Sequence, residues 1–482
     1  MIINPLGKSR FKPVVLLVPS WRSLTAYTPE GIKTAHGVKP CLALLESLEM
    51  VNLYVSHSLR ELLNATGANN WEASLWKGHV TTLRLDGTKV RVHSLRRLLD
   101  EVEGDAEKYH ALNELTAWLE VRGVAPASIS GMAWSLWRST LEAPVEIGFT
   151  AKVGRSALYG GRQEAAPAGD FSDMVALDMS SAYPYEMASR PYAGTLREVA
   201  KTTVLDPNQA GIATATVYVP KDLPHAPLPV RLGNDSIGWS HGELNGTWTW
   251  QELSAAASLG CKVEVTKCYA PLTEIQPFTA WWEVVRDGRA SMSPGGAKLV
   301  KALSNSLWGL FAMTGDSSGT LRWADDHGIK AISTDSKKKR LPQSNAAHLA
   351  AETTSRVRSR MLLEGLYGGE NHEPNFPAHI DTDGVIIPRS TLSRFSSYMI
   401  GAKVGQWRVK QEMNRLEVKA PQLYRFTCSA NCSHGWHYVA SGMTTKQAQA
   451  FFDRPERGLK ISLNSTEEQT AKQLERELLK LS

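Results

Sequence analysis

Residues 175–185 read VALDMSSAYPY, and this stretch decides the fold. An apolar strand ends abruptly at Asp178, and a turn follows it. A second stretch, residues 379–387, reads HIDTDGVII and places Asp381 and Asp383 at the tip of an apolar hairpin. A carboxylate on an apolar strand is costly unless it is paired or metal-bound. Three aspartates presented from two adjacent strands therefore predict an oxygen-rich site for Mg²⁺ or Mn²⁺.

A third stretch strengthens this interpretation, since residues 381–384 have the composition of an ordinary turn as well. Residues 298–309 read KLVKALSNSLWG, a helical pattern. At about 100° per residue, four side chains fall within an arc of about 80°: Lys298, Lys301, Asn305 and Trp308. A solvated basic face is the common alternative, but it needs neither the amide nor the indole. A nucleoside triphosphate would supply charges for the lysines and a base for the aromatic ring.

The 482 residues are 42% hydrophobic and 21% charged, a globular composition that predicts two or three domains and excludes a largely disordered chain. No apolar run approaches the roughly 18 residues of a membrane span, and the N-terminus lacks a signal pattern. We therefore expect a cytoplasmic protein with no membrane partner. Five cysteines are an odd and sparse set, which argues against a disulfide framework. A net charge of +6 is compatible with binding to nucleic acid.

In their order, the three stretches resemble motifs A, B and C of family B DNA polymerases. Residues 178–184 resemble D-x-x-S-L-Y-P with alanine for leucine, and residues 301–309 resemble K-x-x-x-N-S-x-Y-G with tryptophan for tyrosine. Residues 381–384 match D-T-D-[SG], although histidine precedes them where the family usually has tyrosine. The resemblance covers about residues 155–430 and is to phage and mobile-element enzymes, protein-primed members included.

The resemblance implies an α/β (α+β) fold, a right-hand polymerase with palm, fingers and thumb. An N-terminal exonuclease-like (RNase H-like) domain would precede it. The expected domains are the degenerate exonuclease-like domain (1–150), a linker with the YGG element (151–173), palm with an inserted segment (174–280), fingers (281–312), palm with motif C (313–400) and thumb (401–482).

The resemblance further implies a DNA-directed DNA polymerase that adds dNTPs to a 3′-hydroxyl with two Mg²⁺ or Mn²⁺ ions. The implied catalytic residues are Asp178, Asp381, Asp383 and Lys301, and the implied metal ligands are Asp178, Asp383 and the Met179 carbonyl. The implied nucleotide-binding residues are Met179, Ser180, Ser181, Tyr183, Arg289, Lys298, Asn305 and Trp308, with Tyr183 excluding a 2′-hydroxyl. The implied DNA contacts are Tyr159, Gly160, Gly161 and Tyr424. Gln422 replaces the lysine of the family's K-x-Y element.

The N-terminal region departs from the family's exonuclease pattern. That chemistry needs about four carboxylates holding two metals. No aspartate precedes Asp86, and Tyr109–Asn113 resembles the third exonuclease motif with asparagine in place of aspartate. A neutral amide does not replace a carboxylate charge, so we expect no 3′–5′ proofreading. The domain would then be retained to bind DNA or a partner.

Local patterns also predict a hairpin over Val80–Val92 and several helices: Ser94–Val102, Glu107–Arg122, Ser128–Leu141, Thr249–Leu259, Asn345–Leu366 and Thr466–Leu481. The Gly, Ala and Pro content of residues 159–173 predicts a connector between domains. Residues 313–345, with KKKR at 337–340, are either an insertion that grips DNA or a solvated loop. The set Cys428, Cys432, His434 and His437 resembles zinc-ligand spacing, but an ordinary thumb hairpin is favoured.

The leading function is thus a DNA-templated DNA polymerase whose partners are primer-template DNA and dNTPs. A catalytically silent nucleic-acid-binding relative that acts as a replication assembly factor is the alternative, although such a factor would not need the aspartates or Lys301. Priming by a terminal protein and primer-independent initiation both stay open. The missing exonuclease carboxylates favour a phage or plasmid origin and hence a bacterial cytoplasm.

Overall fold

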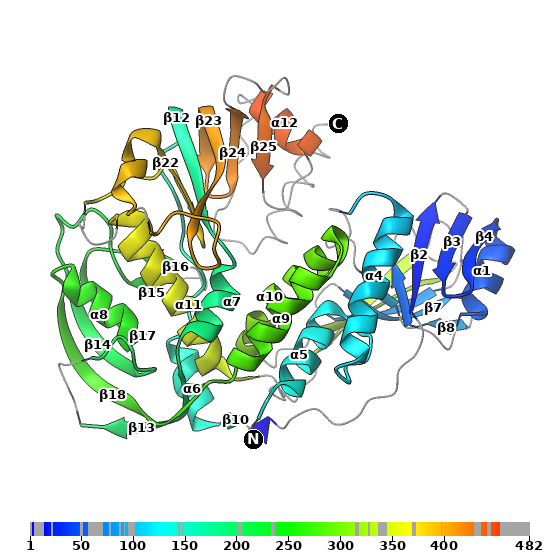
Figure 1. The fold of residues 1–482 in the computed structure, drawn as a ribbon, viewed down its shortest axis with the longest axis horizontal. Helices are drawn as coiled ribbons and strands as arrows, with labels where there is room; N and C mark the ends of the chain where they lie inside the picture. Colours follow the sequence, from blue (N-terminus) through cyan, green and yellow to red (C-terminus); the bar gives the residue numbers. More distant parts are fainter. Residues whose placement is uncertain are drawn as a thin grey trace. The chain divides into compact units, whose positions relative to one another are not determined.

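The computed structural model describes residues 2–3, 14–20, 23–48, 52–55, 71–76, 79–85, 88–90, 92–94, 102–142, 145–146, 148–200, 205–232, 237–313, 318–325, 328–335, 345–368, 373–396, 398–428, 435–440 and 445–453 (Figure 1). These residues form two compact units. The first combines residues 1–151 with 276–347, and the second combines residues 152–275 with 348–482.

The first unit contains a mixed five-stranded sheet whose strand order is β4-β3-β2-β5-β9. Its strands are β2 (Val14–Ser20), β3 (Ser23–Thr28), β4 (Gly31–His36), β5 (Asn52–Val55) and β9 (Val92–Ser94). The first three are antiparallel neighbours, while β5 is parallel to β2 and β9 is parallel to β5. Strand β2 begins at Val14. It is buried at Leu16 and Leu17, which explains its unbroken apolar run.

A second sheet of this unit has the order β20-β19-β6-β7-β8. Its strands are β6 (Trp71–Trp76), β7 (His79–Leu85), β8 (Thr88–Val90), β19 (Ser318–Asp325) and β20 (Gly328–Asp335). The predicted hairpin at residues 80–92 is confirmed by the β7–β8 pairing, in which Leu85 faces Thr88. Of the two alternatives for residues 313–345, the solvated loop is wrong for the described residues, because β19 and β20 form a hairpin that pairs with β6. The insertion that grips DNA stays a prediction. The KKKR segment lies outside the described residues.

Helices complete the first unit: α1 (Val38–Glu46), α4 (Asp105–Glu120), α5 (Ile129–Ser139), α9 (Thr279–Ser291) and α10 (Pro294–Ala312), with the small pair β1 (Ile2–Ile3) and β10 (Val145–Glu146). An aromatic cluster joins α5 to the later helices. The ring of Trp137 lies 4.8 Å from that of Phe311 and 5.8 Å from that of Phe278, and its indole N–H donates to the Pro277 carbonyl at 2.8 Å. The predicted helices at 107–122 and 128–141 are confirmed. The one predicted at 94–102 falls mostly outside the described residues.

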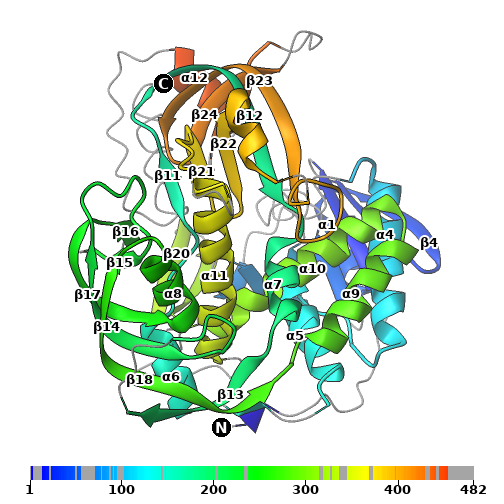
Figure 2. The ribbon, with the colours of Figure 1, turned by 60° about the vertical axis from the view of Figure 1, so that its left-hand side comes forward.

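The second unit is built on a seven-stranded sheet, ordered β11-β21-β22-β12-β23-β24-β25 (Figure 2). Its strands are β11 (Gln163–Ala165), β12 (Gly169–Met179), β21 (His379–Asp381), β22 (Gly384–Pro388), β23 (Trp407–Ala420), β24 (Leu423–Cys428) and β25 (His437–Ala440). All the pairings are antiparallel.

One prediction is corrected by this sheet. Residues 159–173 are no connector, since β11 pairs with β21 and residues 169–173 begin β12, while α6 (Phe149–Ser156) includes residues 151–156. The glycines and alanines of residues 159–173 are compatible with a strand once neighbouring strands satisfy the backbone. The thumb boundary at residue 401 stays a prediction, and β23 beyond it pairs directly with β12.

A four-stranded sheet, β13-β18-β14-β17, lies in the same unit. Its strands are β13 (Tyr192–Val199), β14 (Ile212–Val219), β17 (Gly242–Thr249) and β18 (Lys262–Ile275), beside the pair β15 (Pro229–Arg231) and β16 (Ile237–Trp239). Helix α8 (Trp250–Ser258) follows β17, as predicted. It begins with a capping box, in which Thr249 Oγ1 accepts from the Glu252 N–H at 3.3 Å.

Helix α11 (Ala347–Arg360), continued by a π-helical segment (Met361–Leu366), packs beside the seven-stranded sheet (Figure 2). Its apolar contacts are Val357, Met361 and Leu362 against sheet residues that include Leu177 and Val385. The other unit-two helices are α7 (Ala182–Ser189), the 3₁₀ segment Arg389–Arg394 and α12 (Thr445–Asp453). The predicted helix at 345–366 is confirmed, and the one at 466–481 lies outside the described residues.

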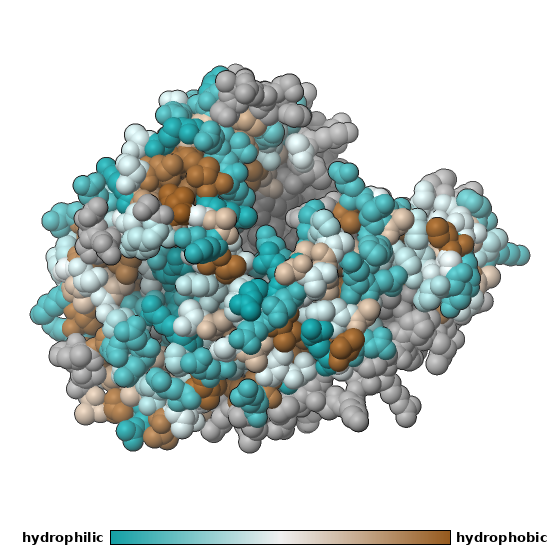
Figure 3. Space-filling model, in the orientation of Figure 1, coloured by the Kyte–Doolittle hydropathy of each residue, from teal (hydrophilic) through white to brown (hydrophobic). Residues whose placement is uncertain are grey.

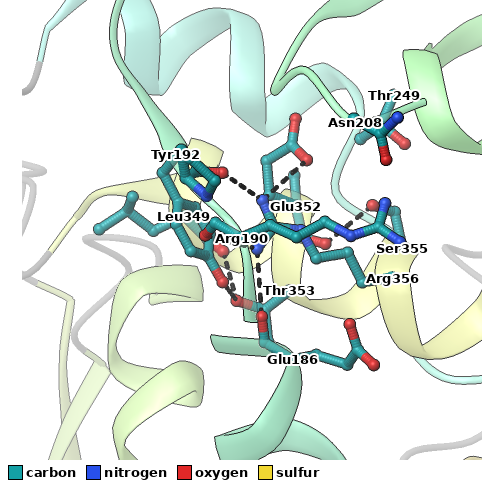
Figure 4. A network of polar contacts seen from close by, with 12 residues as sticks. Glu186, Arg190, Tyr192, Asn208, Thr249, Leu349, Glu352, Thr353, Ser355 and Arg356 are labelled. Atoms are coloured by element: carbon teal, nitrogen blue, oxygen red, sulfur yellow. Dashed lines mark hydrogen bonds and ion pairs between the residues drawn. The ribbon is translucent and has the colours of Figure 1, made fainter. Parts of the chain in front are cut away.

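Helix α11 is unusual because much of its buried surface is polar. Arg356 is 2% exposed and donates to three backbone carbonyls at the end of α7, those of Glu186, Arg190 and Pro191 (Figure 4). Glu352 is 3% exposed, with one oxygen 3.9 Å from the Arg356 guanidinium. Burial raises the pKa of the Glu352 carboxyl to about 7. The arginine thus fixes the C-terminus of α7 to the centre of the unit.

Among the described residues, no helix is long and apolar enough to cross a membrane. The face drawn in Figure 3 mixes hydrophilic and hydrophobic residues, with one larger hydrophobic group near β22.

Candidate active site

Motif A occupies the end of β12 and the start of α7. The strand runs through Asp178 and ends at Met179, one residue beyond the predicted end at Asp178. The turn after it is held by the Ser180 N–H, which donates to the Gln406 carbonyl at 2.9 Å, and by the Gly405 N–H, which donates to the Ser180 carbonyl at 2.8 Å. Ser181 adopts a left-handed φ of 53°. A fixed, strained turn at this point indicates a site whose geometry matters.

Motif C is the predicted hairpin, with β21 ending at Asp381 and β22 beginning at Gly384. The two residues between them form the turn, and Thr382 has a φ of 60°, which is rare for a β-branched residue. Its N–H donates to the Arg162 carbonyl at 2.7 Å, so the preceding segment of the chain holds the turn in this form.

The sheet brings motifs A and C together. Asp178 lies opposite Gly384 in the β12–β22 pairing, and the Met179 N–H donates to the Asp383 carbonyl at 2.8 Å. The pKa of the Asp383 carboxyl is raised to about 6, first by burial and then by the negative charge of Asp178. The carboxylate of Asp178 therefore lies close enough to Asp383 to disfavour its ionisation.

This donor set fits a divalent cation. Carboxylate and carbonyl oxygens are hard ligands of the kind that Mg²⁺ and Mn²⁺ prefer, and a cation would relieve the repulsion that raises the Asp383 pKa. In the described part of the chain, no group of three or more His, Cys, Asp or Glu side chains lies close enough together to hold a metal ion. Asp381 is turned toward two amides, accepting from Gln163 Nε2 at 3.3 Å and Gln422 Nε2 at 3.2 Å.

Two basic residues at this site were missed in the sequence. Arg408 Nη2 lies 2.9 Å from Asp178 Oδ2, and Lys410 Nζ lies 3.9 Å from Asp178 Oδ1. Both come from β23, the strand after motif C. The signal that could have revealed them is the R-V-K alternation, which puts two basic residues near the same face of a strand.

Tyr183 lies on the first turn of α7 and packs against the core of the seven-stranded sheet. Burial raises its pKa, and the charge of Asp383 adds to the shift. Its ring is thus close to the motif C carboxylates, as the sequence predicted for a residue of the same site.

The YGG element contacts motif C. Arg358 of α11 donates to the carbonyls of Tyr159 and Gly160 at 2.6 and 2.8 Å. Gly161 lies directly against Thr382, where a Cβ atom would be 2.7 Å from the threonine side chain. This segment therefore supports the hairpin that carries the aspartates.

Gln422 and Tyr424, which follow motif C in the chain, contact His379 of the motif C hairpin. Gln422 has a left-handed φ of 58°, and its N–H donates to His379 Nε2 at 2.8 Å. The ring of Tyr424 lies 4.9 Å from that of His379, and burial with the charge of Asp381 raises its pKa to about 12. The histidine that replaces the family's tyrosine therefore has a structural partner in the backbone of Gln422.

The comparisons with known proteins agree with these motifs. Residues 124–354 match the family model described as DNA polymerase type B, organellar and viral. The match includes motifs A and B, so this part of the chain is similar to the type B DNA polymerases. No curated protein sequence matches the chain.

The fold of the chain is similar to solved structures of Phi29 DNA polymerase. The complex with primer-template DNA is 12% identical, with a TM-score of 0.66 over 91% of this chain and 94% of that one. The complex with primer-template DNA and incoming nucleotide substrates is 12% identical, with a TM-score of 0.65 over 91% and 93%. The predicted α/β polymerase fold with palm, fingers and thumb is confirmed by this likeness.

The motif B residues lie on α10, in the other unit. Lys298, Lys301 and Asn305 are exposed and Trp308 is half-buried, whereas the opposite face of the helix is buried at Leu299, Val300, Leu303 and Leu307. Ser293 caps the helix, accepting from the Gly296 N–H at 3.2 Å, and Pro294 occupies the first turn. Arg289 lies half-buried on α9. The predicted common face is confirmed.

The cysteine and histidine residues near the C-terminus are described in part. Cys428 ends β24 and His437 begins β25, and their Sγ and Nε2 atoms are 2.9 Å apart. The two strands form the antiparallel pair that was predicted. Cys432 and His434 lie outside the described residues.

Proposed function

We propose that the chain is a DNA-templated DNA polymerase that extends a 3′-hydroxyl with dNTPs. The observation that carries the proposal is the meeting of Asp178 and Asp383 at the ends of paired strands, where burial and then the charge of Asp178 raise the pKa of Asp383 to about 6. Partly buried carboxylates on neighbouring strands suit phosphoryl transfer better than they suit folding, because their burial and repulsion cost stability.

In the proposed reaction the primer 3′-oxygen forms a bond to the α-phosphorus of the nucleotide. The bond from that phosphorus to pyrophosphate breaks, and the hydroxyl proton is lost. Two Mg²⁺ or Mn²⁺ ions, when bound, would favour the alkoxide and neutralise the phosphate charge. Asp178, Asp383 and the Met179 carbonyl would hold them, with Asp381 as a supporting carboxylate. Lys301 would contact the triphosphate and donate a proton to the leaving pyrophosphate.

The remaining roles concern selection of substrates. Tyr183 would lie under the sugar and exclude a 2′-hydroxyl, with the motif A turn at Ser180 and Ser181 around the triphosphate. On the helices of motif B, Asn305 and Trp308 would line the nascent base pair, with Lys298 and Arg289 as further triphosphate contacts. The exposure of Lys298, Lys301 and Asn305 on one helix face supports this assignment.

Primer-template DNA is the proposed macromolecular partner, with Tyr159, Gly160, Gly161 and Tyr424 near it. The Phi29 enzyme, whose fold this chain shares, is described in complex with primer-template DNA and nucleotides. We propose that Tyr159 and Tyr424 support the site from within the protein and do not contact DNA directly. Tyr159 is 4% exposed, and burial raises the pKa of Tyr424. Whether a terminal protein primes synthesis is left to the experiment below.

We also propose that the enzyme does not proofread. The central strand of the mixed sheet, β2, carries no carboxylate, and neither does β3 beside it. The helix α4 presents Asn113 where the third exonuclease motif would have aspartate. The mixed sheet supports an exonuclease-like ancestry, but β2, β3 and residues 109–113 lack the carboxylates with which the family's exonuclease motifs hold two metals.

The test is extension of a labelled primer on a defined template with Mg²⁺ or Mn²⁺. Wild type is compared with Asp178→Ala and with Asp170→Ala, an exposed aspartate on the same strand. Loss of extension in the first variant alone supports the proposal. DNA binding without extension by the wild type favours the catalytically silent relative, and a lane without primer reports de novo starts. Shortening of a mismatched 3′ end would contradict the absence of proofreading.

A further inference from the structure

Arg408 and Lys410 are positively charged and lie beside Asp178, which the proposed mechanism assigns as a metal ligand. Both Asp178 oxygens face a cation, Oδ2 at 2.9 Å from the guanidinium and Oδ1 at 3.9 Å from the ammonium. The aspartate side chain is 17% exposed, against 47% for Arg408 and 64% for Lys410. The cations therefore approach a half-buried anion from the solvent side.

The strand geometry shows how two basic side chains reach one carboxylate. Arg408 lies directly opposite Asp178 in the β12–β23 pairing. The register then shifts, since Leu177 pairs with Val409 and Ala176 pairs with Gln411. Lys410 is the extra residue of this β-bulge, and bulges characteristically redirect a side chain beside a functional site.

We infer that Arg408 is a resident counter-cation of Asp178 and competes with divalent metal for it. This inference rests on the proposed function, because it takes Asp178 as a metal ligand. The guanidinium hydrogen-bonds to Oδ2, so a metal ion that needs this oxygen must displace it. The guanidinium also repels an approaching cation until it is released.

Asp178 would therefore have two mutually exclusive states, one paired with Arg408 and one bound to metal. Without metal, Arg408 offsets the repulsion between Asp178 and Asp383 and keeps motif A in place. With metal, the arginine is released to solvent, which its 47% exposure permits. Lys410 contributes less, because 3.9 Å is the outer limit of an ion pair and the ammonium is well solvated.

The experiment measures Mn²⁺ binding to the metal-free protein by electron paramagnetic resonance, without DNA or nucleotide. We expect Arg408→Gln to bind Mn²⁺ about three- to ten-fold more tightly than wild type, the range of a partly exposed ion pair. Arg408→Met, which keeps the aliphatic stem, is expected to do the same. Arg408→Lys keeps the charge and stays within about two-fold of wild type, as does Arg415→Gln, an exposed arginine farther along β23.

Unchanged or weaker binding in both Arg408→Gln and Arg408→Met would overturn the inference. Asp178→Asn separates this failure from failure of the proposed function. If Asp178→Asn weakens Mn²⁺ binding while the arginine variants do not alter it, only the competition is wrong. If Asp178→Asn leaves Mn²⁺ binding unaltered, the metal assignment is wrong and the inference fails with it.

Discussion

Gly161 lies so close to Thr382 that a Cβ atom on residue 161 would be 2.7 Å from the threonine Oγ1 and Cγ2 atoms. Thr382 is the strained residue between the two motif C aspartates, and its N–H donates to the Arg162 carbonyl at 2.7 Å. A glycine in the preceding segment thus determines where the carboxylates stand.

Gly161→Ala should therefore displace the hairpin and lower the rate of nucleotide incorporation about ten- to hundred-fold, because small misplacements of reacting groups are costly. Gly160→Ala is the matched control, since its Cβ would meet only Ile237 at 3.7 Å, an ordinary contact. Single-turnover extension measures both. Equal losses in the two variants, with weakened DNA binding, would indicate that the glycines act through the template backbone instead.

Tyr183→Ala should relax sugar discrimination. The ring packs against the core near the motif C carboxylates, so its removal leaves room where the 2′-hydroxyl would otherwise meet it. We expect the preference for dNTPs over rNTPs, measured as a ratio of kcat/KM, to fall about ten-fold or more. Tyr185→Ala, on the same helix but 37% exposed, should leave the ratio unaltered. An unchanged ratio in Tyr183→Ala would remove its assigned role.

Local signals predicted the elements that carry the site. The D-T-D-G run between apolar residues predicted the motif C hairpin, and the arc of Lys298, Lys301 and Asn305 predicted the exposed face of α10, because turn chemistry and helical periodicity depend on neighbouring residues alone. Pairing between distant segments was not predictable in this way. The partner of residues 318–325 is residues 71–76, which no local pattern indicates.

The same limitation explains the missed counter-cation. The contact of Arg408 with Asp178 depends on the register of two strands 230 residues apart and on a bulge within one of them. Residues 159–173 were misinterpreted for a related reason, since their composition is that of a loop and only the neighbouring strands make them part of a sheet.

Lys301→Ala should lower kcat/KM for dNTPs about hundred-fold, the usual cost of losing a group that stabilises transition-state charge. Lys298→Ala, one turn earlier on the same exposed face of α10, should lower it less. Arg286→Ala is the control, because that side chain is 58% exposed on α9 and pairs with Asp287. Pre-steady-state incorporation, measured over a range of dNTP concentrations, separates an effect on the rate of incorporation from an effect on nucleotide binding. Equal effects of the two lysines would show that the helix register assigned to motif B is wrong.

Glu352 should make the stability of the protein depend on pH. Burial raises the pKa of its carboxyl from 4.5 to about 7, despite the nearby Arg356 (Figure 4). The folded state therefore binds this proton more tightly than the unfolded chain does. Its contribution to stability is fully present below about pH 4.5 and is lost as the pH rises through about 7.

Glu352→Gln removes the proton-binding group while keeping its shape, so this part of the pH dependence should disappear. We expect the variant to gain stability relative to wild type as the pH rises from about 4.5 to about 7, by at most about 1.4 kcal/mol per pH unit, and the difference to level off above about pH 7. Urea unfolding at several pH values, without metal, measures the difference, and Glu198→Gln on the exposed part of β13 serves as the control. A constant difference across this range would mean that the carboxyl is already ionised in the fold, held by Arg356 at 3.9 Å.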